Sequence, residues 1–176
     1  SSLLSSILPA FINYAMLSGR LRQYSTSFIC VSDFIRRAAL KKGFPSEKLV
    51  VHYTGIDVER LPARNAAGED GLIVHVGRLV EVKGTKFLIR SMARIKAAHP
   101  NARLIVIGDG PLKYGLAKEA TALGLGTSIR FLGALPNEET LSWIRKAAVL
   151  VVPSVTIANG YAEALGMVNL EASCQG

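Results

Sequence analysis

The sequence predicts an α/β protein with a Rossmann-like, doubly wound parallel sheet, and three observations support this fold class. Short runs rich in Val and Ile alternate along the chain with longer amphipathic stretches. The runs are apolar at consecutive positions, as strands are when helices cover both faces of a parallel sheet. The connections between runs and stretches are short, which favours right-handed parallel crossovers in an open sheet.

The apolar runs predict strands at residues 27–31, 49–53, 72–76, 103–107, 129–132 and 149–152. The amphipathic stretches between the later strands predict helices at residues 85–98, 112–123 and 138–147. In the first of these helices, Phe87, Leu88, Met92 and Ile95 are expected near one buried face. Asn137 precedes two glutamates, a composition typical of a helix start with acidic residues in the first turn.

A change of composition at residues 62–71 (PARNAAGEDG) divides the chain into two parts. Its proline, glycines and small polar residues indicate an interdomain linker. Residues 1–61 are then interpreted as the end of an N-terminal domain, and residues 72–176 as a second domain that is incomplete at its C-terminus. Residues 1–18 predict a helical segment that is too interrupted for a membrane span and lacks the basic start of a signal peptide.

The composition limits the classes of partner. Of the 176 residues, 49% are hydrophobic and 19% are charged, which is typical of a packed globular protein. The net charge of +8 suits nucleic acid, an anionic membrane surface or a phosphorylated small ligand. Nucleic acid is disfavoured because the cations are scattered and are not interleaved with aromatic residues. The basic cluster at residues 36–42 is interpreted first as a solvated helix face, with attraction to a membrane as the alternative.

The two cysteines and the absence of acidic clusters bear on cofactors. Cys30 and Cys174 have no metal-ligand spacing and are expected to be buried, reduced thiols. The sequence offers no acidic metal cluster either, so no metal is expected. Gly108-Asp109-Gly110 invites a dinucleotide interpretation, but Lys113 stands where the third glycine of that motif belongs. A plain strand-to-helix turn is therefore favoured over a nicotinamide site.

Ligands of open parallel sheets bind beyond the carboxyl ends of the strands, so the residues there form the candidate site. Gly77, Gly108 and Gly133 each follow a strand and are interpreted as leaving room for a ligand near the backbone. Arg78 and Lys83 lie five positions apart in the loop after the third strand, so both could meet one diphosphate. The alternative is a pair of exposed loop cations.

Two carboxylates near the end of the sequence, Glu163 and Glu171, flank seven residues. If a helix begins near Gly166, the free amides of its first turn face the strand ends and suit an anion. Carboxylates are good acceptors for the vicinal hydroxyls of a ribose or a hexose. The alternative is an acid that stabilises the helix dipole, followed by an exposed Glu171.

These elements in this order resemble the retaining glycosyltransferases of GT-B fold, family four, also called glycosyl transferases group 1. The resemblance covers roughly residues 26–176. Its segments are Gly77-Arg78-Leu79 with Lys83-Gly84, Gly108-Asp109-Gly110-Pro111, Phe131-Leu132-Gly133, the stretch from Glu163 to Glu171, and upstream Val31-Ser32 with Gly55-Ile56-Asp57.

The resemblance implies transfer of a hexose from a nucleotide-diphosphate sugar to a glycan or lipid-linked acceptor, with retention of configuration, in polysaccharide or glycolipid biosynthesis. It implies no metal and no other cofactor. The catalytic residues implied are Arg78 and Lys83, which hold the diphosphate, and Glu163, which contacts the transferred sugar. The nucleotide-binding residues implied are Gly77, Gly108, Gly110, Gly133, Leu135, Leu165, Gly166, Met167 and, on the ribose, Glu171.

The resemblance also suggests what this chain lacks. A GT-B enzyme has two similar domains, and here most of the first one is missing, so the fragment is expected to be inactive. A non-catalytic nucleotide-sugar-binding module is the alternative, and Ala164, where a glycine is usual, favours it. Nucleotide sugars are cytosolic, so a cytoplasmic location is expected, with peripheral contact at the inner membrane face through residues 36–42.

Overall fold

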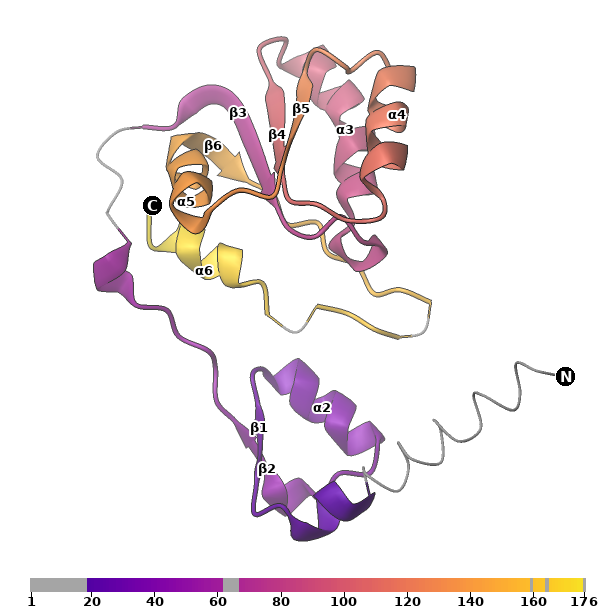
Figure 1. Cartoon of the computed structure of the whole chain (residues 1–176), viewed down its shortest axis with the longest axis vertical. Coiled ribbons are helices and arrows are strands. Elements are labelled where there is room, and N and C mark those ends of the chain that lie inside the picture. Colours follow the sequence, from indigo (N-terminus) through magenta and orange to yellow (C-terminus); the bar gives the residue numbers. More distant parts are fainter. Residues whose placement is uncertain (1–18, 62–66, 159, 164, 176) are drawn as a thin grey trace, which may run out of the picture. The chain divides into compact units, whose positions relative to one another are not determined.

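The computed structural model describes residues 19–61, 67–158, 160–163 and 165–175 (Figure 1). The helical segment predicted at residues 1–18, the first half of the predicted linker and Ala164 lie outside the described residues. The chain divides into two compact units, residues 1–54 and residues 55–176. Residues 55–61, which the sequence suggested belong to the first part, therefore group with the second unit.

The second unit contains a four-stranded parallel sheet, which confirms the predicted fold class. Its strands are β3 (Glu69–Val76), β4 (Arg103–Ile107), β5 (Ile129–Gly133) and β6 (Ala147–Leu150). The order across the sheet is β5-β4-β3-β6. The helices are α3 (Thr85–Ala98), α4 (Lys113–Ala122), α5 (Asn137–Lys146) and α6 (Met167–Ser173), with a short 3-10 turn, η3 (Glu81–Lys83), ahead of α3.

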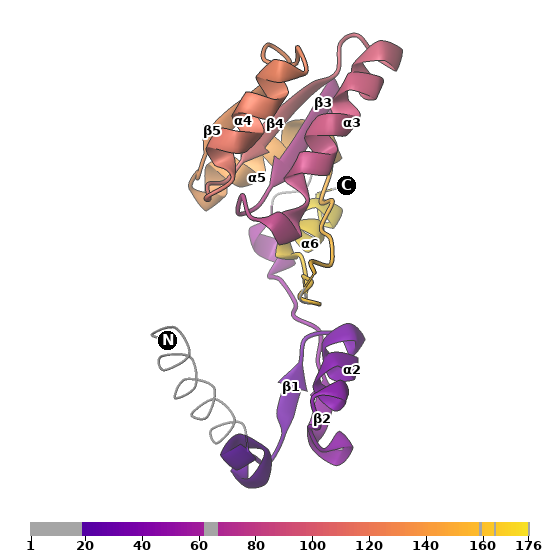
Figure 2. The same cartoon turned by 90° about the vertical axis from the view of Figure 1, so that its right-hand side faces the viewer.

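Helices cover both faces of this sheet, with α3 and α4 on one side and α5 on the other (Figure 2). Alternate residues of β4 supply the two cores: Leu104 and Val106 pack among α3 and α4, whereas Ile105 and Ile107 pack with Trp143 of α5. This alternation explains why the strands are apolar at consecutive positions. A third cluster joins α5 to α6 through Ile144 and includes Leu61, which ties residues 55–61 to this unit.

Two local expectations are wrong. Phe87 is 52% exposed, and the buried face of α3 is instead formed with Ile89, which is fully covered. Cys174 is exposed at the end of the short helix α6, whereas Cys30 is buried as expected. The helix start expected at Asn137 is confirmed, because α5 begins there with Glu138 and Glu139 in its first turn.

The first unit pairs β1 (Phe28–Cys30) with β2 (Leu49–Val51) in parallel, and α2 (Asp33–Lys41) connects them. Ser32 caps α2, since its hydroxyl oxygen accepts a hydrogen bond from the Ile35 amide at 3.3 Å. A 3-10 turn, η1 (Ser46–Lys48), precedes β2, and another, η2 (Val58–Arg60), follows in the second unit. Among the described residues, no helix has the length and apolar character needed to cross a membrane.

Candidate functional site

The strand order fixes where a ligand site is expected. The chain leaves β3 toward β4 and β5 on one side, then returns to add β6 on the other side of β3. The crevice outside the carboxyl ends of β3 and β6 is therefore the topological switch point, which is the usual binding position in open α/β sheets. Arg78 and Lys83 follow β3, and Glu163 lies in the segment that follows β6. Three of the predicted site residues thus belong to this end of the sheet.

Glu163 is the centre of a contact network at this switch point. One carboxylate oxygen, Oε1, accepts a hydrogen bond from the Lys83 ammonium, with which it forms an ion pair. The other oxygen, Oε2, accepts a hydrogen bond from the Ser154 hydroxyl. The side chains of Lys83 and Glu163 are only 19% and 17% exposed. The structure therefore brings together two predicted site residues and adds Ser154, which the sequence analysis did not identify as a site residue.

The pKa of Glu163 reflects this arrangement. Burial of its carboxyl acts to raise the pKa, but the hydrogen bonds from Lys83 and Ser154, and the positive charge of Lys83, outweigh it. The pKa of Glu163 is therefore held below its ordinary value. Glu163 remains a carboxylate at neutral pH, so it can accept hydrogen bonds from sugar hydroxyls but has no proton to donate.

The depressed pKa of Glu163 predicts a pH-dependent contribution to stability. Its folded pKa lies below the unfolded value, so the stabilisation is complete above the unfolded value and is lost as the pH falls through the folded one. Thermal unfolding followed by circular dichroism is the measurement. The difference in Tm between the wild type and Glu163→Gln should be constant near neutrality and should shrink below about pH 4.3. A difference that grows on acidification would contradict the assignment.

The loops that carry Lys83 and Ser154 are joined by their backbones. Gly84, at the end of η3, has a φ of +65°, and a Cβ built on it would lie 1.9 Å from the carbonyl oxygen of Pro153. The Val155 amide donates a hydrogen bond to the Val82 carbonyl oxygen at 2.8 Å. Only glycine satisfies both the left-handed backbone and this close approach. The Lys83 and Ser154 loops are thus held at a fixed separation.

The glycines at the other strand ends have a structural explanation. A Cβ on Gly108 would lie 1.9 Å from the Gly77 carbonyl oxygen, and one on Gly110 would lie 2.6 Å from the Leu79 carbonyl oxygen. The close approach of neighbouring backbone therefore explains these two glycines without a ligand, and a role of Gly108 and Gly110 in nucleotide binding stays a prediction. Gly133 differs, since its missing Cβ faces the Lys113 ammonium at 3.6 Å.

The loop after β4 carries a second pair of opposite charges. The Lys113 ammonium lies 2.6 Å from Asp109 Oδ2, and Asp109 Oδ1 accepts the Gly110 amide at 2.8 Å. Both hydrogen bonds hold the pKa of the exposed Asp109 carboxyl below its ordinary value, and the bond from Lys113 has the larger effect. Lys113 stands where the third glycine of the dinucleotide motif belongs, and its bond to Asp109 links the two sides of a strand-to-helix turn. This agrees with the plain turn that the sequence analysis favoured.

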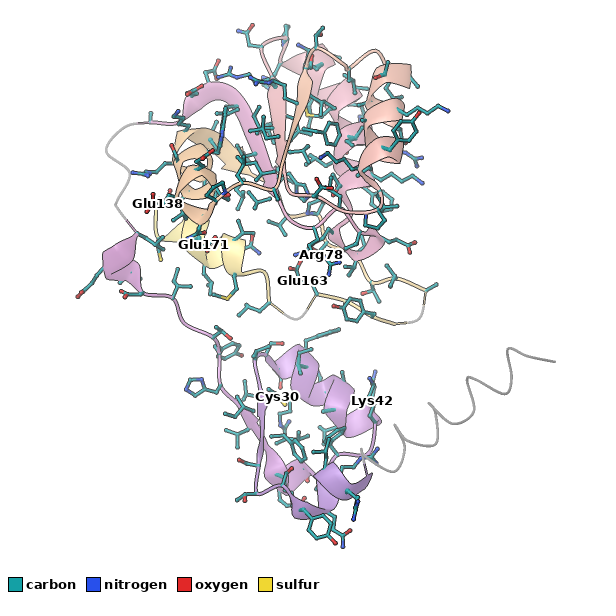
Figure 3. All side chains as sticks on the ribbon, viewed as in Figure 1. Cys30, Lys42, Arg78, Glu138, Glu163 and Glu171 are labelled. Carbon is teal, nitrogen blue, oxygen red and sulfur yellow. The ribbon has the colours of Figure 1, made fainter. Side chains whose placement is uncertain are left out.

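Arg78 and Glu171 differ from the Lys83–Glu163 pair because neither forms an ion pair with another described residue. The Arg78 side chain is exposed in the loop after β3, and it makes no ion pair within the described part of the chain. Glu171, in α6, is half-buried and likewise has no partner among residues whose positions are described. Figure 3 labels Arg78 and Glu163 in the loops at the α6 end of the second unit, and Glu171 on α6 itself. Both ionised groups are available to a ligand.

The remaining predicted binding residues lie around the start of α6 and after β5. Gly166 precedes α6, and a Cβ on it would lie 3.6 Å from Glu163 Oε1, so the Glu163 carboxylate borders that helix start. Leu165 and Met167 flank Gly166. The Leu135 side chain packs against the core, which leaves its backbone as the part that can meet a ligand. Within the described ranges there is no cluster of three or more metal-ligating side chains, and the expectation of no metal stays a prediction.

A doubly wound parallel sheet with charged residues at its switch point is an architecture that commonly binds ligands at that position. The profile of the family described as Glycosyl transferases group 1 matches residues 57–176, and this chain belongs to that family. The match confirms the resemblance inferred from the motifs.

Individual relatives point the same way. A GDP-mannose-dependent alpha-(1-6)-phosphatidylinositol monomannoside mannosyltransferase of Mycolicibacterium smegmatis is 33% identical over 118 residues, which cover 66% of this chain and 31% of that protein. A GDP-mannose-dependent monoacylated alpha-(1-6)-phosphatidylinositol monomannoside mannosyltransferase of Corynebacterium glutamicum is 28% identical over 185 aligned positions, which cover 94% of this chain and 48% of that protein. The chain thus spans about a third and about half of these two relatives.

Solved structures agree on the fold. The Anabaena protein HepE in complex with UDP and glucose superposes with a TM-score of 0.75 at 22% identity, over 93% of this chain and 46% of that one. The C-terminal domain of a glycosyl transferase group 1 protein from Francisella tularensis gives a TM-score of 0.58 at 24% identity, over 69% of this chain and 67% of that one.

Proposed function

We propose that this chain supplies the donor-binding part of a hexosyltransferase that uses a nucleotide-diphosphate sugar. The observation that carries the proposal is the Lys83–Glu163 pair at the switch point between β3 and β6. The pair places a cation that can bind phosphate beside a carboxylate that can accept hydrogen bonds from sugar hydroxyls. The chain that carries both residues belongs to a family of glycosyltransferases. The expected residue roles follow from this charge pattern.

In the proposed reaction, the bond between the anomeric carbon and the diphosphate breaks, and negative charge develops on the departing phosphate. Arg78 and Lys83 stabilise that charge, Arg78 with a planar fork of donors and Lys83 as a point charge. Because cations at the site stabilise the leaving group, no metal is needed in this proposal. Glu163 accepts hydrogen bonds from hydroxyls of the transferred hexose, and Glu171 accepts those of the ribose. We further propose that the sugar is transferred with retention of configuration.

The relatives support a nucleotide-sugar donor and a glycan or lipid-linked acceptor. Two of them are named for GDP-mannose and for phosphatidylinositol mannoside acceptors, and a structural neighbour was solved with UDP and glucose. We propose an acceptor of this general kind for the whole protein. We also propose that the first unit, residues 1–54, belongs to an acceptor-side domain, so that this chain alone binds donor without transferring sugar.

Calorimetric titration with UDP-, GDP- and ADP-sugars tests donor binding. We expect the wild-type chain to bind at least one of the three nucleotides. Glu171→Ala should weaken that binding by about 10-fold, because it removes a charge-assisted acceptor of the ribose hydroxyls. Glu47→Ala, which removes a carboxylate from the first unit, is the matched control and should bind like the wild type. Equal affinity of the Glu171→Ala variant would remove Glu171 from the site.

The alternative, a non-catalytic nucleotide-sugar-binding module, predicts the same binding but no transfer in any longer form of the protein. Assaying release of nucleoside diphosphate by the longer protein with a glycan or lipid acceptor distinguishes the two proposals. Donor turnover would exclude the binding module, whereas tight binding without turnover would favour it.

Peripheral contact with an anionic membrane is a further part of the proposal. Helix α2 has no buried residue, and it carries Arg36, Arg37 and Lys41, followed by Lys42. Arg37 is paired with Asp33 at 3.0 Å, which reduces the charge available to lipid. We expect sedimentation with vesicles containing anionic lipid but not with neutral vesicles, and a loss of about 1 kcal/mol for each cation replaced by glutamine. Equal sedimentation with both vesicle types would leave only the solvated-face interpretation.

A further inference from the structure

His75 is a buried imidazole with both ring nitrogens hydrogen-bonded. It lies in β3, two residues before Gly77, and is fully covered. Its Nδ1 lies 2.9 Å from the carbonyl oxygen of Val151, which directly follows β6. Its Nε2 lies 2.9 Å from the Thr85 hydroxyl oxygen, at the first residue of α3. Because a carbonyl oxygen can only accept, Nδ1 carries the proton, and Nε2 accepts the hydrogen of the Thr85 hydroxyl.

These two bonds join the segments that hold the candidate site. Thr85 follows Lys83 and Gly84 directly, and Val151 lies three residues before Ser154. The same two segments approach again where Gly84 meets the Pro153 carbonyl oxygen. The Lys83–Glu163 ion pair, whose side chains are partly exposed, is a further contact between them. The His75 ring is the fully covered member of this set of contacts.

We propose that His75, as the neutral tautomer protonated on Nδ1, is a positioning residue that sets the separation of Lys83 from Ser154 and Glu163. The inference rests on the proposed function, since this separation matters for catalysis only if the Lys83–Glu163 pair binds the donor. His75 does not touch the donor in this proposal. It acts through Thr85 on the Lys83 loop and through Val151 on the segment after β6.

The surroundings favour the neutral ring. Burial is the main cause that lowers the pKa of His75, and the hydrogen bond to Val151 opposes it. The charged groups that act on the ring are Lys83, which disfavours a second positive charge, and Glu163, which favours it. A protonated ring would have no acceptor at Nε2, so the Thr85 hydroxyl would have to accept a hydrogen bond from Nε2 instead of donating one. The pKa of the folded state lies below the unfolded value, so this stabilisation is complete above about pH 6.5 and is lost as the pH falls through the folded value.

Nitrogen-15 NMR of the histidine rings tests the tautomer without any ligand. His75 should show a protonated Nδ1 and an unprotonated Nε2, and it should stay neutral below the ordinary histidine pKa of about 6.5. A neutral ring protonated on Nε2, or a ring that gains its second proton at or above that pH, would overturn the proposal. This measurement stands even if the wild-type chain binds no nucleotide, a result that would refute the proposed function alone.

Variants of Thr85 test positioning with little change of volume. Thr85→Val removes the donor to Nε2 and should weaken nucleoside diphosphate binding by about 10-fold, because Lys83 loses its anchor. Thr85→Ser keeps the hydroxyl and should restore wild-type affinity. The double variant His75→Phe with Thr85→Val should bind no more weakly than His75→Phe alone, since both substitutions remove the same His75–Thr85 hydrogen bond. Wild-type affinity for Thr85→Val, or additive losses in the double variant, would overturn the proposal.

Discussion

Replacing Lys83 with methionine is expected to weaken nucleoside diphosphate binding by about 10- to 100-fold, because a charge-assisted hydrogen bond to phosphate contributes about 1.5–3 kcal/mol. The stem of methionine keeps the apolar packing against Gly77, so the loss reports the ammonium. Isothermal titration calorimetry with UDP and GDP is the measurement. Lys96→Met, at the far end of α3, makes the same substitution outside the site and should bind like the wild type.

The Lys83–Glu163 ion pair makes this prediction more specific. In the ligand-free chain Glu163 competes with any phosphate for the Lys83 ammonium. Glu163→Gln should therefore bind a nucleoside diphosphate without sugar at least as tightly as the wild type, while losing preference for the sugar-bearing donor. In the Lys83→Met background the same change should have a smaller effect on diphosphate affinity. A large loss of diphosphate affinity from Glu163→Gln alone would contradict the assigned roles.

Gly84→Ala is expected to cause the largest loss of stability, about 2–5 kcal/mol, from left-handed backbone strain together with overpacking. The backbone at Gly84 has a φ of +65°, and the new methyl group would lie 1.9 Å from the Pro153 carbonyl oxygen. Urea unfolding followed by circular dichroism measures the change in the free energy of unfolding. Because the loops carrying Lys83 and Ser154 meet here, diphosphate binding should weaken as well.

Gly124 provides the matched control. Its φ is +70°, close to that of Gly84, but nothing lies within 4 Å of an added Cβ. Gly124→Ala should therefore cost only the backbone strain, about 1–2 kcal/mol. The excess loss in Gly84→Ala measures the close approach of the two loops. Equal losses at the two positions would show that Pro153 moves aside without cost and that the loops are not rigidly joined.

The fold could be read from the sequence because its main determinants are local. Strands buried on both faces require consecutive apolar residues, and those residues are visible without any structure. The orientation of α3 was harder to predict, because apolar residues at 87, 88 and 89 fit more than one helical face. Only contact with the sheet decides that Ile89 is buried and Phe87 exposed. Cys174 was misjudged for a similar reason, since burial at the end of a short helix depends on its neighbours.

The charged residues of the candidate site could be predicted from the sequence, but the contacts between them could not. Motif order identified Lys83 and Glu163, yet no local pattern could show that they form an ion pair across 80 positions. Ser154 was missed because its partner lies nine positions away through an irregular loop. The two hydrogen bonds of His75 could not be predicted either, because they depend on Thr85 and Val151, which only the fold brings together. The glycines in the sequence likewise indicate that another group comes close to the chain at these positions. They do not show whether that group is a ligand or neighbouring backbone.

A crystal structure of the chain with a bound nucleoside diphosphate tests the central claim most directly. The account predicts the diphosphate at the switch point between β3 and β6, with its oxygens within hydrogen-bonding distance of the Lys83 ammonium and the Arg78 guanidinium. Lys83 should then have exchanged Glu163 for phosphate. A diphosphate bound elsewhere, with the Lys83–Glu163 ion pair intact, would contradict the account.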